Sequence, residues 1–121
     1  MLFQSDNRPQ FFNLPKLLGD LHPYVHVEVD EPPQKFFTVG ASGANPNWND
    51  ETELIINDNS DEVLIEIFGA SGPKRKDNDK FLGLAIVGVN ELKSSLDNVH
   101  HLQLQSRPYQ NDRVSGSLTI Q

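Results

Sequence analysis

The stretch LHPYVHVEVD, residues 21–30, decides the fold. After its proline the side chains alternate strictly, so that they fall on opposite sides of an extended chain. One side carries three valines and the other carries three different side chains: Val25, Val27 and Val29 against Tyr24, His26 and Glu28. This period of two predicts a half-buried β-strand. His22 stands directly before the proline, at the tip of the preceding loop, and its role there needs an explanation.

Six further runs have strand-like patterns and are separated by turn residues: 35–39, 51–57, 63–68, 81–89, 100–105 and 115–121. The run at 63–68 is apolar on both faces, which is typical of a central strand. Residues 90–98 predict one helical turn or a short helix, with Asn90 as its N-cap. Because no helix of three turns is indicated, the pattern predicts an all-β antiparallel β-sandwich.

The position of the first strand stays open. Residues 1–12 contain apolar residues without a sustained period, so a strand lies either at 1–4 or at 10–12, or the element is truncated or displaced. The chain of 121 residues is long enough to bury a core. We therefore expect a single domain over residues 1–121.

Composition excludes several classes of function. The chain has no cysteine, which excludes disulfide scaffolds and thiolate metal sites. No stretch is long and apolar enough to cross a membrane, and the N-terminus lacks the pattern of a secretion signal, so we expect a cytoplasmic location. The net charge of −7 argues against general binding to nucleic acid. No serine has a predicted histidine and acid around it, so we expect no enzyme activity.

The charge is concentrated unevenly. Residues 73–80, PKRKDNDK, carry a net charge of +2, which leaves −9 for the rest of the chain. Successive loops of an antiparallel sandwich fall at alternate ends. Three segments should therefore meet at one tip: 18–23, 40–50 and 69–80. Long loops gathered at one end of a rigid sandwich are a usual way to build a binding site.

Several motifs in order resemble the C2 domain, over about residues 13–121. They are NLPKLLGDLHPYVHVEVD (13–30), KFFTV (35–39), NPNWNDE (45–51), EVLIEIF (62–68), DNDKFLG (77–83) and GSLTIQ (116–121). The resemblance implies a Greek-key sandwich of about eight strands whose tip loops bind membranes, often through calcium. The chain departs from the family in residues 1–12, where long alternating strands are usual.

The resemblance also implies where calcium ligands would stand, and most of these positions lack a carboxylate. They correspond to His22, Gly69, Ser71 and Lys80. Calcium prefers oxygen ligands, so imidazole, glycine and an ammonium group are poor substitutes. Asp20, Asp77 and Asp79 stay as weak metal candidates. We expect no cofactor, and membrane binding that does not need calcium.

Each singled-out residue also has a simpler interpretation. His22 is either a titrating contact or, more commonly, a turn residue. Trp48 is either a membrane contact or, as the resemblance favours, a packing residue. The four histidines include His26, but no cysteine or carboxylate evidently completes a zinc site with them.

Two functions follow from these observations. The first is calcium-independent binding to anionic phospholipid headgroups through the basic loop residues: Lys74, Arg75, Lys76 and Lys80. Such binding is weak and needs avidity. The second is a protein-interaction scaffold, in which the acidic body binds a partner and either Phe36 or Phe37 is an outward aromatic anchor.

Overall fold

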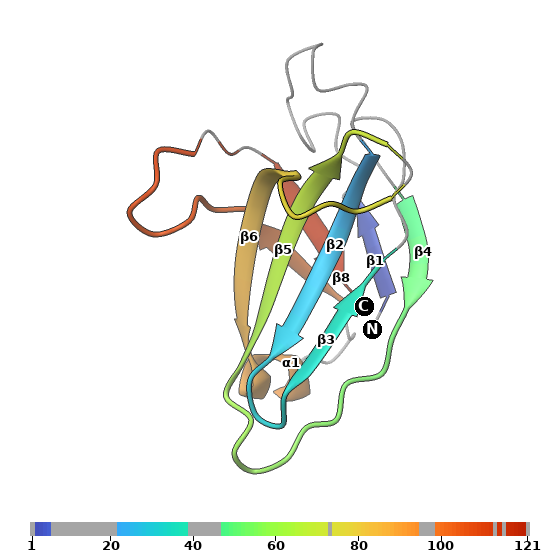
Figure 1. Ribbon diagram of the computed structural model, residues 1–121. Helices are drawn as coiled ribbons and strands as arrows, with labels where there is room; N and C mark the ends of the chain where they lie inside the picture. Colours follow the sequence, from blue (N-terminus) through green and yellow to red (C-terminus); the bar gives the residue numbers. More distant parts are fainter. Residues whose placement is uncertain are drawn as a thin grey trace.

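The protein is described by a computed structural model that covers residues 2–5, 22–38, 47–72, 74–94, 99–112, 114 and 116–120. Two four-stranded antiparallel sheets pack face to face (Figure 1). The first has the strand order β3-β2-β5-β6 and the second β4-β1-β8-β7. The predicted all-β antiparallel sandwich is confirmed.

The front sheet of Figure 1 contains the strands that the sequence pattern indicates most clearly: β2 (His22–Val29), β3 (Gln34–Phe37), β5 (Glu62–Ala70) and β6 (Lys80–Gly88). The stretch at 21–30 forms β2, and the run at 35–39 returns beside it as the second arm of a hairpin. β5 lies between β2 and β6 and is central, as its two-sided apolar pattern predicts.

The second sheet consists of shorter strands, which lie behind the first in Figure 1: β1 (Leu2–Ser5), β4 (Asn47–Glu51), β7 (His100–Gln103) and β8 (Ser117–Ile120). Of the positions left open for the first strand, 1–4 is the one where the structure has β1, whereas 10–12 lies outside the described residues. The short helix α1 (Val89–Ser94) follows β6 directly, in agreement with the predicted helical turn at 90–98. The predicted N-cap is wrong, because the helix begins at Val89 and Asn90 lies inside it.

The strand predicted at 51–57 is wrong in its position. β4 ends at Glu51, and residues 52–57 belong to no strand. Leu54 and Ile56 still pack against the core while Ile55 is exposed, so the alternation reports burial correctly. The backbone of Ile55, however, is paired with a side chain: the Gln34 amide donates to its carbonyl at 2.8 Å and accepts from its N–H at 2.7 Å.

The core lies between the two sheets. It is formed by the valines of β2, by residues of β5 and β6, and by residues of the second sheet. The fully buried side chains of this core are Val25, Val27, Val29, Val63, Ile65, Ile67, Val87, Leu118 and Ile120. The other side of β2, with Tyr24, His26 and Glu28, therefore faces outward. This outer face of the front sheet therefore presents polar and aromatic side chains.

Candidate functional site

The described parts of the predicted tip segments do come together. In the β2–β5 ladder, His22 pairs with Ala70 and Pro23 with Gly69. The indole N–H of Trp48 donates to the carbonyl of Pro23 at 2.8 Å, which attaches the beginning of β4 to the beginning of β2. Trp48 is buried and belongs to the core, so it packs as the resemblance favours. Residues 18–21 and 40–46 lie outside the described residues.

The positions that the resemblance predicts to correspond to calcium ligands lie at this tip. Gly69 is buried in β5 and pairs with Lys80 of β6 on one side, while His22 at the start of β2 is half-buried. Ser71 and Lys80 are exposed. The ladder thus places these positions on three neighbouring strands or directly beyond them. Asp20 lies outside the described residues.

Asp79 accepts hydrogen bonds both from the sheet and from its own loop. Its Oδ2 accepts a hydrogen bond from the Tyr24 hydroxyl at 2.6 Å and another from the Lys76 backbone N–H at 2.8 Å. Burial, and then this hydrogen bond and the charge of Asp79, raise the pKa of Tyr24, while nearby Arg75 opposes the shift. Asp79 thereby fixes the turn at 76–79 on the sheet. Asp77, within the same turn, is exposed.

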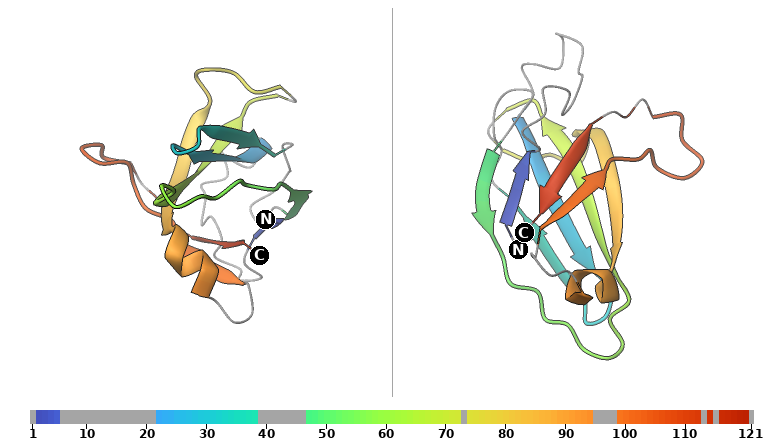
Figure 2. Two further views of the ribbon diagram at one scale, coloured as in Figure 1. Left: turned by 90° about the horizontal axis from the view of Figure 1, so that it is seen from below. Right: turned by 180° about the vertical axis from the view of Figure 1, so that it is seen from behind.

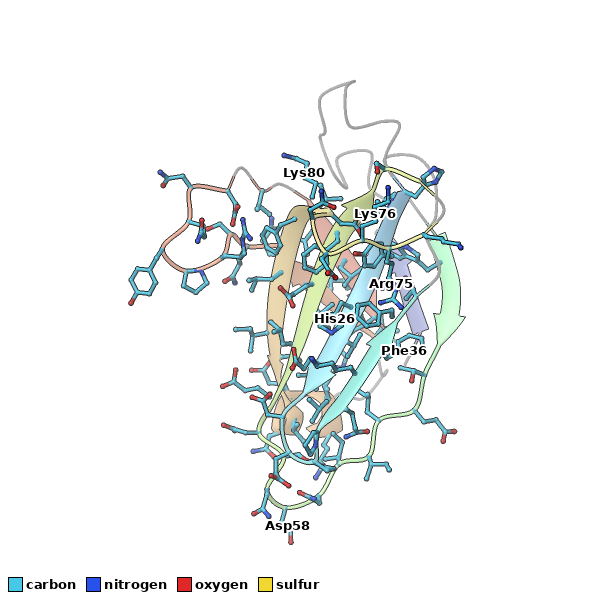
Figure 3. All side chains as sticks on the ribbon, in the orientation of Figure 1. His26, Phe36, Asp58, Arg75, Lys76 and Lys80 are labelled. Atoms are coloured by element: carbon cyan, nitrogen blue, oxygen red, sulfur yellow. The ribbon has the colours of Figure 1, made fainter. Side chains whose placement is uncertain are left out.

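The loop between β5 and β6 turns back over the outer face of the sheet. In Figure 1 it is the yellow segment that crosses in front of the upper ends of β2 and β5. Lys76 and Lys80 lie at the upper end of the sandwich, whereas Arg75 lies lower, over the sheet (Figure 3). Its guanidinium carbon is 3.6 Å from the centroid of the Phe37 ring, a cation–π contact. Lys74, Lys76 and Lys80 are exposed.

Phe36 and Phe37 face opposite sides, as residues next to each other in a strand do. Phe36 is partly buried and packs against the core. Phe37 is the outward aromatic and is 36% exposed. Besides Arg75, the Phe37 ring contacts His26, whose ring is stacked on it with centroids 4.4 Å apart.

Aromatic rings form a row across the outer face, one from each strand of the front sheet. Tyr24 lies 6.3 Å from Phe37 and 5.8 Å from Phe68, and Phe68 lies 5.8 Å from Phe81. Arginines cover the two ends of the row, since Arg107 lies 4.5 Å from the Phe81 centroid. The sequence analysis missed this row. The alternation in β2 placed Tyr24 on the side opposite the valines, but the neighbours of its ring on other strands depend on the register.

The segment between β7 and β8 supplies the second of these arginines and was also missed. It forms the orange loop that extends away from the sandwich in Figures 1 and 2. Arg107 donates to both carboxylate oxygens of Asp112, at 2.7 and 3.0 Å. This bidentate hydrogen bonding holds the pKa of Asp112 below its usual range. The pair fixes the base of an exposed loop.

An acidic groove lies at the opposite end of the same face. Its volume is about 330 Å³, and it is lined by Glu28, Asp30, Glu31, Asn59, Asp61, Glu62, Leu64 and Ile86. Ile86 is 55% exposed, so the groove has an apolar floor with five acidic side chains around it. Figure 3 places Asp58 at the lower end of the domain and Lys76 and Lys80 at the upper end.

A two-sheet antiparallel sandwich with a basic loop beside one tip is typical of β-sandwich modules that bind through their loops. Comparison with protein families matches residues 10–104 to the C2 domain. The chain therefore belongs to the C2 domain family, as its motifs indicated. C2 domains serve in general as membrane-targeting or protein-interaction modules and are generally not enzymes. Among the described residues, no helix has the length and apolarity that a bilayer crossing requires.

Proposed function

We propose that this C2 domain is a non-enzymatic, cytoplasmic module that binds anionic membranes through its β5–β6 loop and does so without calcium. The observation that carries the proposal is the position of the loop. Lys74, Lys76 and Lys80 are exposed in or beside a segment whose turn is held in place by Asp79. A fixed cluster of ammonium groups at one tip can approach a membrane while the acidic body stays away from it.

Calcium independence is supported by the chemistry of the tip. A calcium site needs six to eight oxygen ligands from converging groups. The corresponding positions read His22, Gly69, Ser71 and Lys80, and Lys80 would bring a positive charge to the cation. One oxygen of Asp79, a remaining candidate, already accepts two hydrogen bonds from the protein.

Membrane affinity through this loop alone is weak. Each basic residue near an anionic surface contributes about 1 kcal/mol, so four give about 4 kcal/mol, which corresponds to a millimolar dissociation constant. Arg75 contacts Phe37, so the initial contact with the membrane depends on the three lysines. The domain therefore needs avidity or a second attachment to stay on a membrane.

Vesicle sedimentation tests the proposal. With phosphatidylserine vesicles, low salt and excess chelator, we expect binding that falls steeply as salt rises, because exposed charges are screened. The triple variant Lys74→Ala/Arg75→Ala/Lys76→Ala should lose this binding. The control Lys35→Ala removes a lysine on the sheet away from the tip and should keep the binding. Wild-type protein that fails to sediment at low salt would contradict the proposal.

A second candidate, a protein-interaction scaffold, is favoured by the acidic groove. Five acidic side chains around the apolar Leu64 and Ile86 fit a basic segment that also carries an aliphatic side chain. Phe37 stays the aromatic anchor predicted for this function. Titration with a lysine- and arginine-rich peptide should shift the amide signals of Leu64 and Ile86, and Ile86→Glu should weaken the binding. Unchanged signals would reject the groove.

A further inference from the structure

Three metal-ligating side chains converge on the outer face of the front sheet, away from the calcium positions. His26 and Glu28 lie two residues apart in β2 and so share a face, and Glu66 of β5 is the register partner of His26. One ligand atom from each of the three residues lies within 4.8 Å of the other two. Strand geometry, rather than a flexible loop, therefore brings the three together.

The distance between two of the ligand atoms already fits a metal centre. Nδ1 of His26 lies 3.3 Å from Oε1 of Glu66. Zinc binds imidazole nitrogen and carboxylate oxygen at about 2.0–2.2 Å, so two ligands of a tetrahedral zinc lie about 3.4 Å apart. Glu28 is partly exposed, and rotation of its side chain can bring a carboxylate oxygen to the third position.

The surroundings of His26 are not those of a histidine that only supports the fold. The residue is 9% exposed, yet its Nε2 is buried without a hydrogen-bond partner among the described residues. Buried polar groups are nearly always paired, so each exception needs a reason. The ring is held by stacking on Phe37 and faces one carboxylate through Nδ1. This arrangement fixes the ring with Nδ1 toward the carboxylate, and only Nε2 is left without a partner among the described residues.

We propose that His26, Glu28 and Glu66 bind a zinc ion on the outer face of the sheet. One imidazole and two carboxylates suit zinc, whereas calcium prefers an all-oxygen set. Three protein ligands leave the fourth position for water or for a group from a partner. The proposal does not depend on membrane binding, since none of the three residues belongs to the basic loop.

Nearby positive charges set the limits of the site. Lys35 Nζ lies 3.9 Å from Glu28 and is an exposed side chain, so it can move away when a cation binds. Arg75 lies over the ring of Phe37, which in turn stacks on His26. On the other side, the negative charge of Glu66 contributes to the raised pKa of Arg107. Replacing Lys35 should therefore strengthen zinc binding rather than weaken it.

A titration of the untagged protein with zinc chloride at pH 7.5 tests the proposal. Binding is monitored by calorimetry and by NMR of the histidine ring nitrogens. We expect one zinc per chain, with a change in the ring nitrogens of His26. Glu66→Gln and Glu28→Gln preserve the size of each side chain, so both should stay folded, and each should weaken zinc binding at least about tenfold. Lys35→Met should bind zinc more tightly than wild type.

Two controls make the outcome decisive. Glu62→Gln removes an exposed acid from β5 outside the cluster, and His100→Ala/His101→Ala removes the adjacent histidines of β7; both should bind zinc like wild type. The absence of zinc binding at 100-fold molar excess would overturn the proposal. So would zinc binding that survives both Glu28→Gln and Glu66→Gln, or that is lost with the β7 histidines.

Discussion

Arg75 lies over the ring of Phe37, with its guanidinium carbon 3.6 Å from the centroid of the ring. One residue of the basic loop is therefore attached to the outer face of the front sheet, while its neighbours Lys74 and Lys76 are exposed. The loop is a fixed part of the sandwich rather than a free basic tail. Its charges consequently have defined positions relative to the tip.

Replacement of Phe37 tests whether the aromatic ring itself contributes to membrane binding. Phe37→Ala removes the contacts with Arg75 and His26, so we expect a loss of about 1–2 kcal/mol in the free energy of unfolding. Arg75 is released toward solvent, so vesicle affinity should stay equal or rise up to about fivefold, the equivalent of about 1 kcal/mol. Ile86→Ala, at the far end of the sheet, is the control. Weaker sedimentation of folded Phe37→Ala would mean that the ring itself contacts the membrane.

Tyr24→Phe tests the role assigned to Asp79. The variant loses a part-buried hydrogen bond to a carboxylate, so urea denaturation should show a loss of about 1.5–3 kcal/mol in unfolding free energy. Folding raises the pKa of Tyr24, so its contribution is present below the unfolded pKa of about 10 and decreases above it. The difference between wild type and variant should therefore shrink at pH 11. A variant as stable as wild type at neutral pH would contradict the structural role assigned to the hydrogen bond between Tyr24 and Asp79.

Asp112→Asn should lower the melting temperature at pH 7, because it removes the bidentate partner of Arg107. The pKa of Asp112 is held low by this hydrogen bonding, so its contribution is present above the unfolded pKa of about 3.9 and is lost as pH falls through the lower folded value. Thermal melts should show that the difference in melting temperature between wild type and variant is smaller at pH 2 than at pH 7. Asp58→Asn, in an exposed turn, is the control, and an equal gap at both pH values would contradict the prediction.

Calcium should leave the stability of the domain almost unchanged. A ligand that binds only the folded state stabilises it by RT ln(1 + [L]/Kd), which is about 0.4 kcal/mol for 1 mM calcium and a millimolar Kd. Thermal melts with 1 mM calcium and with excess chelator should then agree to about 1–3 °C. A rise of ten degrees would mean that Asp20, Asp77 and Asp79 form a real site.

The sequence predicts the layers of the fold well because burial follows a period of two. The valines of β2 and the two-sided pattern of β5 located the front sheet directly. β4 could not be placed in the same way, since Leu54 and Ile56 alternate like a strand while the Gln34 side chain, rather than a neighbouring strand, pairs with Ile55.

Much of the site chemistry depends on register, which alternation alone does not specify. His26 and Glu66 are forty residues apart and become neighbours only through the β2–β5 ladder. The contact of Arg75 with Phe37 likewise requires the path of the loop over the sheet. The position of the basic run near the tip could be predicted because it depends only on the parity of the loops.

The central claim is that the β5–β6 loop meets anionic lipid without calcium, and an amide NMR titration tests it residue by residue. In excess chelator, phosphatidylserine nanodiscs should shift or broaden the signals of residues 74–80 and leave those of the acidic groove unchanged. Adding calcium in excess of the chelator should not extend or strengthen the effect. Shifts that begin only after calcium is added, or that gather at Leu64 and Ile86 instead of the loop, would contradict the account.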